Sequence, residues 1–262
     1  MERLQKLGGL DTRRVKKMCM ESRPLLKLLV EAGLGSRRRL ADIIRQGRVR
    51  VNGEAIEDFS HPVDVETDTV MVDGELVNLR PEPTVYLMLN KPAGVLSTTK
   101  DTRGRKTVID ILPKKYRGLR LYPVGRLDKD STGLLLLTND GGLTYQLTHP
   151  KFQHDKEYLI FIKDKLQPSE KEEIEKGLQL DDGMTHPTRI KEVKTPPPFN
   201  YSITMHEGRK RQVRRMFEKL DHHVLALKRV RVGGLSLGKL KEEQTRELTV
   251  QEMKALLPGC FH

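Results

Sequence analysis

The apolar positions near the start of the chain predict two short helices and a hairpin. One helical face is indicated by four apolar residues that lie three or four positions apart: Leu25, Leu28, Leu29 and Ala32. Gly33 and Gly35 end this helix, and Ser36 can cap a second helix with an apolar inner face. The alternating segment 48–53 then predicts a strand that enters an Asn-Gly hairpin turn. With short strands further on, these elements predict a compact module over residues 23–78.

Beyond this module, strand and helix patterns are intermixed. Strand patterns occur in four places: Val85–Asn90, Leu134–Leu137, Tyr158–Ile162 and Tyr201–Met205. Two capping boxes, Ser169 with Glu172 and Thr249 with Glu252, predict the starts of helices. Another helix is predicted by an amphipathic set: Val213, Met216, Phe217 and Leu220. Because regular strand–helix–strand spacing is missing, we expect an α+β fold with a mostly antiparallel sheet.

The net charge of the chain indicates what kind of partner it binds. The 262 residues include 48 Lys and Arg against 36 Asp and Glu, which gives a net charge of +12. Such a basic excess favours a polyanionic partner such as nucleic acid, although it could also serve solubility alone. There is no Trp, and only 6 Tyr and 6 Phe are present. We therefore expect recognition of RNA shape and backbone rather than of stacked bases.

The cysteines and the first residues bear on location. Cys19 and Cys260 lie near opposite ends and cannot form a disulfide framework. No apolar run approaches the roughly 20 residues that span a membrane, so we expect a cytoplasmic protein without membrane contact. Residues 1–22 form a basic leader without the apolar segment of a secretory signal. We expect this leader to be disordered, unless translation starts at Met18 or Met20.

The second predicted helix has an unusual outer face. The pattern predicts an outer face that is entirely basic, and a further arginine follows: Arg37, Arg38, Arg39 and Arg45, then Arg48. A solvated helix normally mixes charges of both signs, so a face of one sign favours contact with phosphates. Residues 23–78 resemble the S4-like RNA-binding domain, with its two short helices, Ser-Arg-Arg run and Val-Asn-Gly hairpin. The resemblance implies that these arginines bind RNA.

Two later segments carry candidate chemistry. Residues 125–135 place Asp128 beside Arg126 directly before an apolar strand, where a carboxylate can be held away from water, and the Ser131 hydroxyl is expected to brace this loop. Residues 208–216 open a helix and leave three arginines to bind solvent, phosphate or a carboxylate: Arg211, Arg214 and Arg215. The sequence lacks a phosphate-binding glycine loop, a dinucleotide fingerprint and a His-Glu-x-x-His zinc motif, so we expect no metal and no cofactor.

These segments resemble motifs of the ribosomal RNA pseudouridine synthases of the RsuA branch. The shared patterns are Gly-Arg-Leu-Asp-x-x-Ser-x-Gly-Leu-Leu, Arg-Gln-Val-Arg-Arg-Met, the stretch Leu89–Val95 and the triplet Lys156-Glu157-Tyr158. The resemblance extends to about Leu257. It implies an S4-like domain followed by a mixed α/β catalytic domain at residues 85–262, and the prolines within residues 79–84 predict a linker between the two.

The resemblance also implies roles for single residues. Asp128 would be the catalytic nucleophile, and Arg214 would pair with it. Tyr158 would line the uracil pocket, and Arg126 would take the place of the flipped base. Lys91, in a Lys-Pro turn, is expected to be structural rather than catalytic. Two further arginines would contact RNA: Arg211 and Arg215.

The implied reaction isomerises a uridine of ribosomal RNA, with the large-subunit 23S RNA as the expected target. The N1 glycosidic bond breaks, the uracil turns and a C5–C1′ bond forms, so no atoms are gained or lost and no cofactor is needed. We expect a monomer whose partner is ribosomal RNA or a pre-ribosomal particle. Two alternatives stay open: a synthase acting on small-subunit 16S RNA, and a non-catalytic RNA-binding factor in ribosome assembly.

Overall fold

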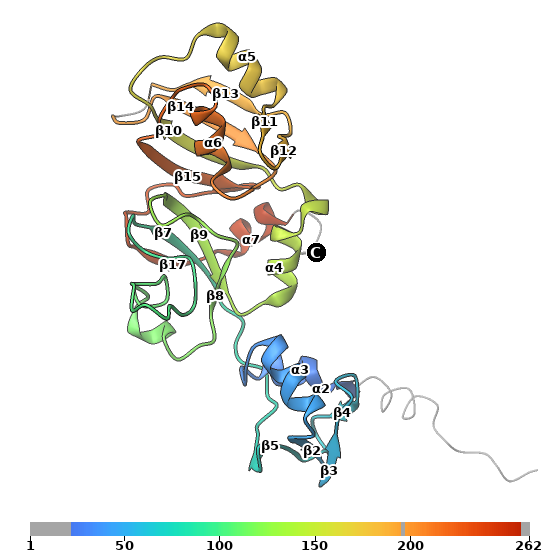
Figure 1. Cartoon of the computed structure of the whole chain (residues 1–262). Coiled ribbons are helices and arrows are strands. Elements are labelled where there is room, and N and C mark those ends of the chain that lie inside the picture. The colour runs from blue at the N-terminus through green and yellow to red at the C-terminus, as the bar shows by residue number, and fades with distance from the viewer. Residues whose placement is uncertain (1–21, 195–196, 258–262) are drawn as a thin grey trace, which may run out of the picture. The chain divides into compact units, whose positions relative to one another are not determined.

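The computed structural model describes residues 22–194 and 197–257. Within these ranges the chain divides into two compact units, with the boundary between Pro83 and Thr84. The first unit is coloured blue to teal in Figure 1, and the second runs from green to red. Residues 1–21 of the predicted basic leader, with both alternative start methionines, lie outside the described residues.

The first unit combines two helices with a small antiparallel sheet of order β3-β2-β5-β6. Its elements are α2 (Leu25–Glu31), α3 (Arg37–Arg45), β2 (Val49–Val51), β3 (Glu54–Ile56), β5 (Val70–Val72) and β6 (Glu75–Leu76), with β1 (Ser22–Pro24) paired to β4 (Pro62–Asp64). Asn52 and Gly53 have left-handed φ values of 54° and 91°, as the predicted hairpin turn requires. Ser36 caps α3, because its hydroxyl accepts the Arg39 N–H at 3.3 Å.

The predicted inner faces of both helices are buried. They form one apolar core with valines of the sheet: Leu25, Leu28, Leu29, Leu40, Ile43, Ile44, Val49, Val51 and Val70. The arginines of α3 remain outside. The prediction of an entirely basic outer face was wrong, however, because Asp42 is also exposed on α3 and pairs with Arg45 at 3.4 Å. Opposite charges three residues apart stabilise a helix, which accounts for this pair.

The second unit is built on a nine-stranded sheet and confirms the α+β prediction. The strand order is β13-β14-β10-β15-β9-β7-β17, with β16 beside β15 and β8 beside β9. All pairs are antiparallel except β15 with β9. The strands are β7 (Tyr86–Lys91), β8 (Tyr122–Val124), β9 (Thr132–Thr138), β10 (Lys156–Phe161), β13 (Arg189–Glu192), β14 (Tyr201–Met205), β15 (Ala226–Val232), β16 (Leu235–Ser236) and β17 (Thr245–Glu247), with a separate hairpin of β11 (Gln179–Leu180) and β12 (Gly183–Met184).

Helices connect and cover the strands of this sheet (Figure 1). They are α4 (Gly141–Thr148), α5 (Pro168–Lys176), α6 (Gln212–Glu218) and α7 (Val250–Leu256), with the 3-10 turns η1 (Lys114–Tyr116) and η2 (Pro150–Phe152). The capping box predicted for α7 is confirmed. The Thr249 hydroxyl accepts the Glu252 N–H at 3.2 Å, and the Glu252 carboxylate accepts the Thr249 N–H at 2.9 Å.

The other predicted capping box, Ser169 with Glu172, was wrong. Helix α5 begins earlier, at Pro168, and Glu170 accepts the backbone N–H of Gln167 at 2.6 Å. Proline is favoured at the first position of a helix, because the N–H that it lacks has no helical partner there. The proline therefore determined where this helix starts.

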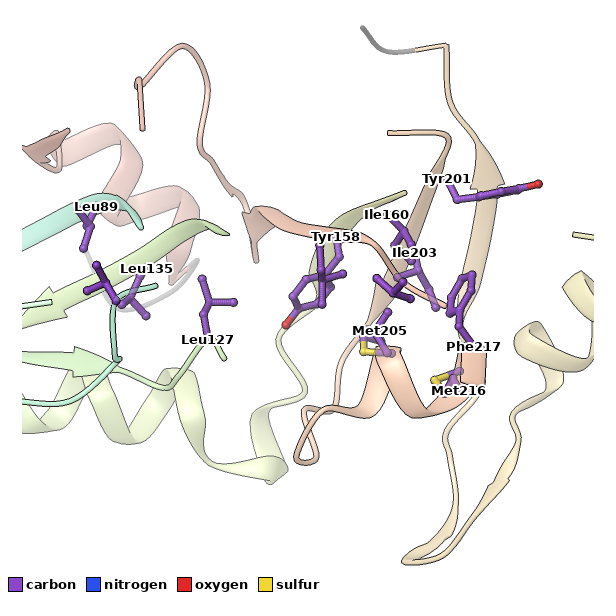
Figure 2. Packing of buried hydrophobic residues seen from close by; sticks show 14 of the residues in the cluster. Leu89, Leu127, Leu135, Tyr158, Ile160, Tyr201, Ile203, Met205, Met216 and Phe217 are labelled. Atoms are coloured by element: carbon purple, nitrogen blue, oxygen red, sulfur yellow. The ribbon is translucent and has the colours of Figure 1, made fainter. Parts of the chain in front are cut away.

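The apolar run of β9 contributes to two cores. Leu135 and Leu137 pack in one core with Tyr158, whereas Leu134 and Leu136 pack in the other with residues of α4 and α7. Figure 2 shows part of the first core, including Leu135 and Tyr158. Successive residues of a strand point to opposite faces, so a sheet covered on both sides requires apolar residues at every position. This double anchoring fixes β9 and the end of the loop that precedes it.

Candidate active site

The loop before β9 carries Asp128 and is fixed by its neighbours. Leu127 is buried in the first core, and Ser97 holds its backbone: Ser97 Oγ donates to the Leu127 carbonyl at 2.8 Å and accepts the Leu127 N–H at 3.1 Å. The Ser131 N–H donates to the Asp128 carbonyl at 3.1 Å. The Asp128 residue is half-buried. Its backbone is therefore constrained on both sides, which limits where its carboxylate can lie.

The ammonium group of Lys91 supports the same loop. The side chain is completely buried, and its Nζ donates to three backbone carbonyls: those of Ser131 at 2.8 Å, Pro92 at 2.9 Å and Lys129 at 3.3 Å. Burial lowers the pKa of Lys91 to about 8, and the negative charges of Asp130 and Asp128 oppose this shift. These bonds agree with the structural role that was predicted for Lys91.

The side chain of Ser131 differs from the prediction. Its hydroxyl is buried and has no hydrogen-bond partner among residues 22–194 and 197–257, so it does not brace the loop. The backbone of Ser131 has this function instead, through its N–H to Asp128 and its carbonyl to Lys91. A turn motif in the sequence cannot distinguish these two ways of bracing a loop.

One cavity of about 710 Å³ is lined by Asp128, Arg126 and Tyr158. The ring of Tyr158 comes from β10 and is only 8% exposed, and Figure 2 shows it between Leu127 and Met205, which also line the cavity. Six further cationic side chains contribute to the lining: Lys100, Arg105, Lys129, Arg209, Lys210 and Arg211. A space of this size and charge can admit a nucleotide with its phosphate.

Arg214 forms its salt bridge with Asp130 and not with Asp128. Its Nη2 lies 3.1 Å from Asp130 Oδ2, and its Nη1 donates to the Val224 carbonyl at 2.7 Å. Arg211 approaches the same Asp130 carboxylate at 3.3 Å. No salt bridge to Asp128 exists in the described part of the chain, so the pairing of Arg214 with Asp128 that the resemblance implied is not present. Asp128 and Asp130 lie two residues apart on one loop, and their spacing in the sequence could not show which of them pairs with Arg214.

The other predicted RNA-binding arginines fall into two groups. Arg37, Arg38 and Arg39 are exposed and form no salt bridge with any described residue. Three others are paired with acidic side chains: Arg45 with Asp42, Arg48 with Asp73 at 2.6 Å, and Arg215 with Asp182 at 2.9 Å. The pairs of Arg45 and Arg48 are exposed and contribute little free energy, so a phosphate can replace their carboxylates at small cost, whereas Arg215 is half-buried.

Comparisons with known proteins agree with this geometry. Residues 85–219 match the RNA pseudouridylate synthase family, and residues 23–70 match the S4 domain. The chain belongs to the RNA pseudouridylate synthase family. This confirms the resemblance that the motifs indicated, together with the presence of an S4 domain. The protein is therefore an RNA pseudouridine synthase, an isomerase, that carries an RNA-binding S4 domain.

Several relatives of this pseudouridine synthase are similar over most of their length. Ribosomal large subunit pseudouridine synthase B of Bacillus subtilis is 42% identical over 91% of this chain and 97% of its own. The protein of the same name from Vibrio vulnificus is 39% identical over 82% of this chain and 68% of its own. The crystal structure of a pseudouridylate synthase aligns with a TM-score of 0.64 and 32% identity, covering 90% of this chain and all of that one.

Two further features are absent from the described residues. None of the helices there is long and apolar enough to cross a membrane. No group of three or more His, Cys, Asp or Glu side chains in the same residues is arranged to hold a metal ion.

Proposed function

We propose that this pseudouridine synthase modifies a uridine of large-subunit 23S ribosomal RNA, with Asp128 as the nucleophile. The observation that carries the assignment of the site is the single cavity lined by Asp128, Tyr158 and Arg126. The choice of ribosomal subunit is supported by the relatives from Bacillus subtilis and Vibrio vulnificus, both named ribosomal large subunit pseudouridine synthase B.

The reaction exchanges one bond at the sugar for another. The N1–C1′ bond breaks, the freed uracil rotates, and C5 bonds to C1′; C5 then loses its proton and N1 takes up a proton. The Asp128 carboxylate is the anionic nucleophile, and the bond that it forms to the nucleoside in the cavity breaks again before the product leaves, which regenerates the carboxylate. The atoms balance without a co-reactant, because the product is an isomer of the substrate.

Arg126 and Tyr158 prepare the substrate for Asp128. A uridine inside a stacked RNA must first leave the stack, at a cost of a few kcal/mol. The exposed guanidinium of Arg126 can fill the vacated place and bind phosphate, while the buried ring of Tyr158 offers a flat apolar face to the uracil. Both effects lower the free energy of the flipped nucleotide.

Arg214 acts on the reaction through a neighbouring residue and not by contact with the substrate. It does not line the cavity, and its contact with the catalytic loop is through Asp130. Since Asp130 lies two residues from Asp128, the buried guanidinium of Arg214 fixes the loop that presents the nucleophile. We therefore assign Arg214 a positioning role.

We infer that the enzyme acts as a monomer in the cytoplasm, on ribosomal RNA or a pre-ribosomal particle. The charge of +12 supports a polyanionic substrate, and two cysteines are too few for a disulfide framework. The relatives named for ribosomal RNA support the same setting.

The experiment that tests the proposed target is a map of pseudouridines in ribosomal RNA from cells with and without this gene. Carbodiimide treatment marks each pseudouridine in the RNA from these cells. In a second assay, purified protein is incubated with transcripts of both subunit RNAs before the same treatment. We expect one mark in the large-subunit RNA to disappear without the gene and to return with the protein. A mark confined to small-subunit RNA would overturn the proposed subunit, and no lost mark in either RNA would overturn ribosomal RNA as the substrate.

The S4 domain provides a second expected result. Replacing Arg37, Arg38 and Arg39 together with Ala should weaken RNA binding. Each arginine that binds a phosphate releases counterions from the RNA, and this favourable release is lost with the arginine. The slope of log affinity against log salt should fall by about three, or about one per arginine. The matched control changes the same three residues to Lys, which keeps the charge and should preserve the slope. An unchanged slope in the Ala variant would show that this face does not contact phosphates.

A further inference from the structure

Three aromatic rings gather on the exposed side of α4 and η2. The ring centroids of Tyr145 and His149 are 4.8 Å apart, and the ring of Phe152 lies 5.8 Å from Tyr145 and 6.3 Å from His149. Tyr145 is 49% exposed and Phe152 is 39% exposed. We call these three residues the aromatic platform.

The platform does not serve the core of its own unit. Helix α4 is anchored by Leu143 and Leu147, which are buried four residues apart on its inner face. Tyr145 lies midway between them in sequence and therefore on another face of the helix. Single exposed apolar residues are common, but three rings in mutual contact form a patch that favours a partner.

The platform also carries an unpaired positive charge. Lys151 Nζ lies 5.1 Å from the ring centroid of Tyr145 and 4.6 Å from that of Phe152. Lys151 forms no salt bridge within the described ranges of the chain. A cation beside flat rings matches a ligand that combines an anion with an aromatic group, and a nucleotide is such a ligand.

A second cavity joins the platform to the catalytic site. It has a volume of about 500 Å³, and one residue of the platform, His149, lines it together with the adjacent Pro150. Arg126 and Tyr158, which line the catalytic cavity, line this cavity as well. Its other charged lining residues are mostly cationic: Lys156, Arg209 and Arg229, with Glu207 as a carboxylate. A polyanionic strand can therefore continue from the catalytic site to the platform.

We propose that the aromatic platform stacks an unpaired nucleotide of the substrate RNA that lies near the target uridine in the strand. The ring planes of Tyr145 and Phe152 lie at 89° to each other, so the base stacks on one of these rings and meets the edge of the other. The phosphates follow Lys151 and the cationic cavity towards Arg126. This proposal rests on the proposed RNA substrate. It adds local base stacking to the recognition of shape and backbone that the low aromatic content predicted.

The test uses 2-aminopurine, whose fluorescence falls when it stacks on an aromatic ring. The probe is a single-stranded oligouridylate of about twelve nucleotides with one central 2-aminopurine, and a duplex form of the same oligonucleotide serves for comparison. Changing Tyr145 and Phe152 together to Leu removes the rings but keeps apolar bulk. We expect this variant to bind the single strand roughly tenfold more weakly and to lose the quenching, with duplex binding unchanged. The matched control Tyr145→Phe keeps the ring and should behave like the wild type.

The outcome can be separated from that of the proposed function. The probe is bound in the Asp128→Asn background, where catalysis does not interfere, and pseudouridine formation by the Leu variant is measured with Asp128 intact. We expect a higher KM and an unchanged kcat. Wild-type quenching in the Leu variant, or equal weakening for single strand and duplex, would overturn the platform while leaving the isomerase assignment untouched. A lower kcat at unchanged KM would also overturn it, because it would indicate a structural effect on the catalytic loop.

Discussion

Changing Asp128 to Asn should abolish pseudouridine formation and leave RNA binding nearly unchanged. Asparagine keeps the size and shape of the side chain, but its neutral amide cannot act as an anionic nucleophile. Loss of a nucleophile typically lowers the rate by at least about 1,000-fold, because the remaining groups bind the substrate without reacting. The measurement compares carbodiimide marks on ribosomal RNA treated with the two proteins, together with RNA affinity by filter binding.

The matched control changes Asp130 to Asn. This substitution also removes one negative charge from the loop, but the charge it removes is paired with Arg214 at 3.1 Å and Arg211 at 3.3 Å. Arg214 is only 6% exposed, so loss of its counter-charge should destabilise the fold by about 1 to 3 kcal/mol and reduce activity without abolishing it. The reverse result, an active Asp128 variant and an inactive Asp130 variant, would transfer the role of nucleophile to Asp130.

This pair of carboxylates shows where sequence analysis reaches its limit. The motif identified the loop that we propose to be catalytic, because an Arg and an Asp directly before an apolar strand form a recognisable local pattern. The partner of Arg214 could not be found in the same way, since that partner depends on how α6 packs against the loop. A local pattern fixes a position along the chain, whereas an ion pair between distant segments depends on the tertiary structure.

The fold shows the same division between local and distant information. The alternation of Leu134 to Leu137 between two cores follows directly from strand geometry and was predictable in outline. The parallel pairing of β15 with β9 was not predictable. It joins strands that lie far apart in the sequence, and nothing in either segment indicates the other as its partner. Burial of Lys91 beneath the loop was similarly invisible in the sequence.

The aromatic platform had a signal that the sequence analysis missed. Tyr145, His149 and Phe152 follow one another at intervals of four and three residues, which is the spacing of one helical face. A count of aromatic residues over the whole chain hid this cluster, because a low total says nothing about local concentration. Local spacing is therefore a better guide to stacking sites than overall composition.

Changing Gly133 to Ala should destabilise the catalytic unit by about 4 kcal/mol. Gly133 is the second residue of β9 and has a φ of +104°, which other residues rarely adopt, and an alanine forced into this conformation costs about 1 to 3 kcal/mol. A Cβ would also lie 2.2 Å from the Arg229 carbonyl oxygen and 2.7 Å from the Arg229 nitrogen. Because Arg229 is its partner in the parallel pair of β15 with β9, the clash involves backbone that cannot rotate away. Denaturant unfolding followed by circular dichroism measures the loss.

Two other glycines separate the causes of this loss. Gly104 has a φ of +69°, but a Cβ there would meet no atom within 4 Å, so Gly104→Ala should cost only about 1 kcal/mol. Gly118 has neither a positive φ nor a close neighbour, and Gly118→Ala should be neutral or slightly stabilising. If Gly133→Ala is no worse than Gly104→Ala, then β15 does not approach β9 closely enough for the Arg229 backbone to exclude a methyl group.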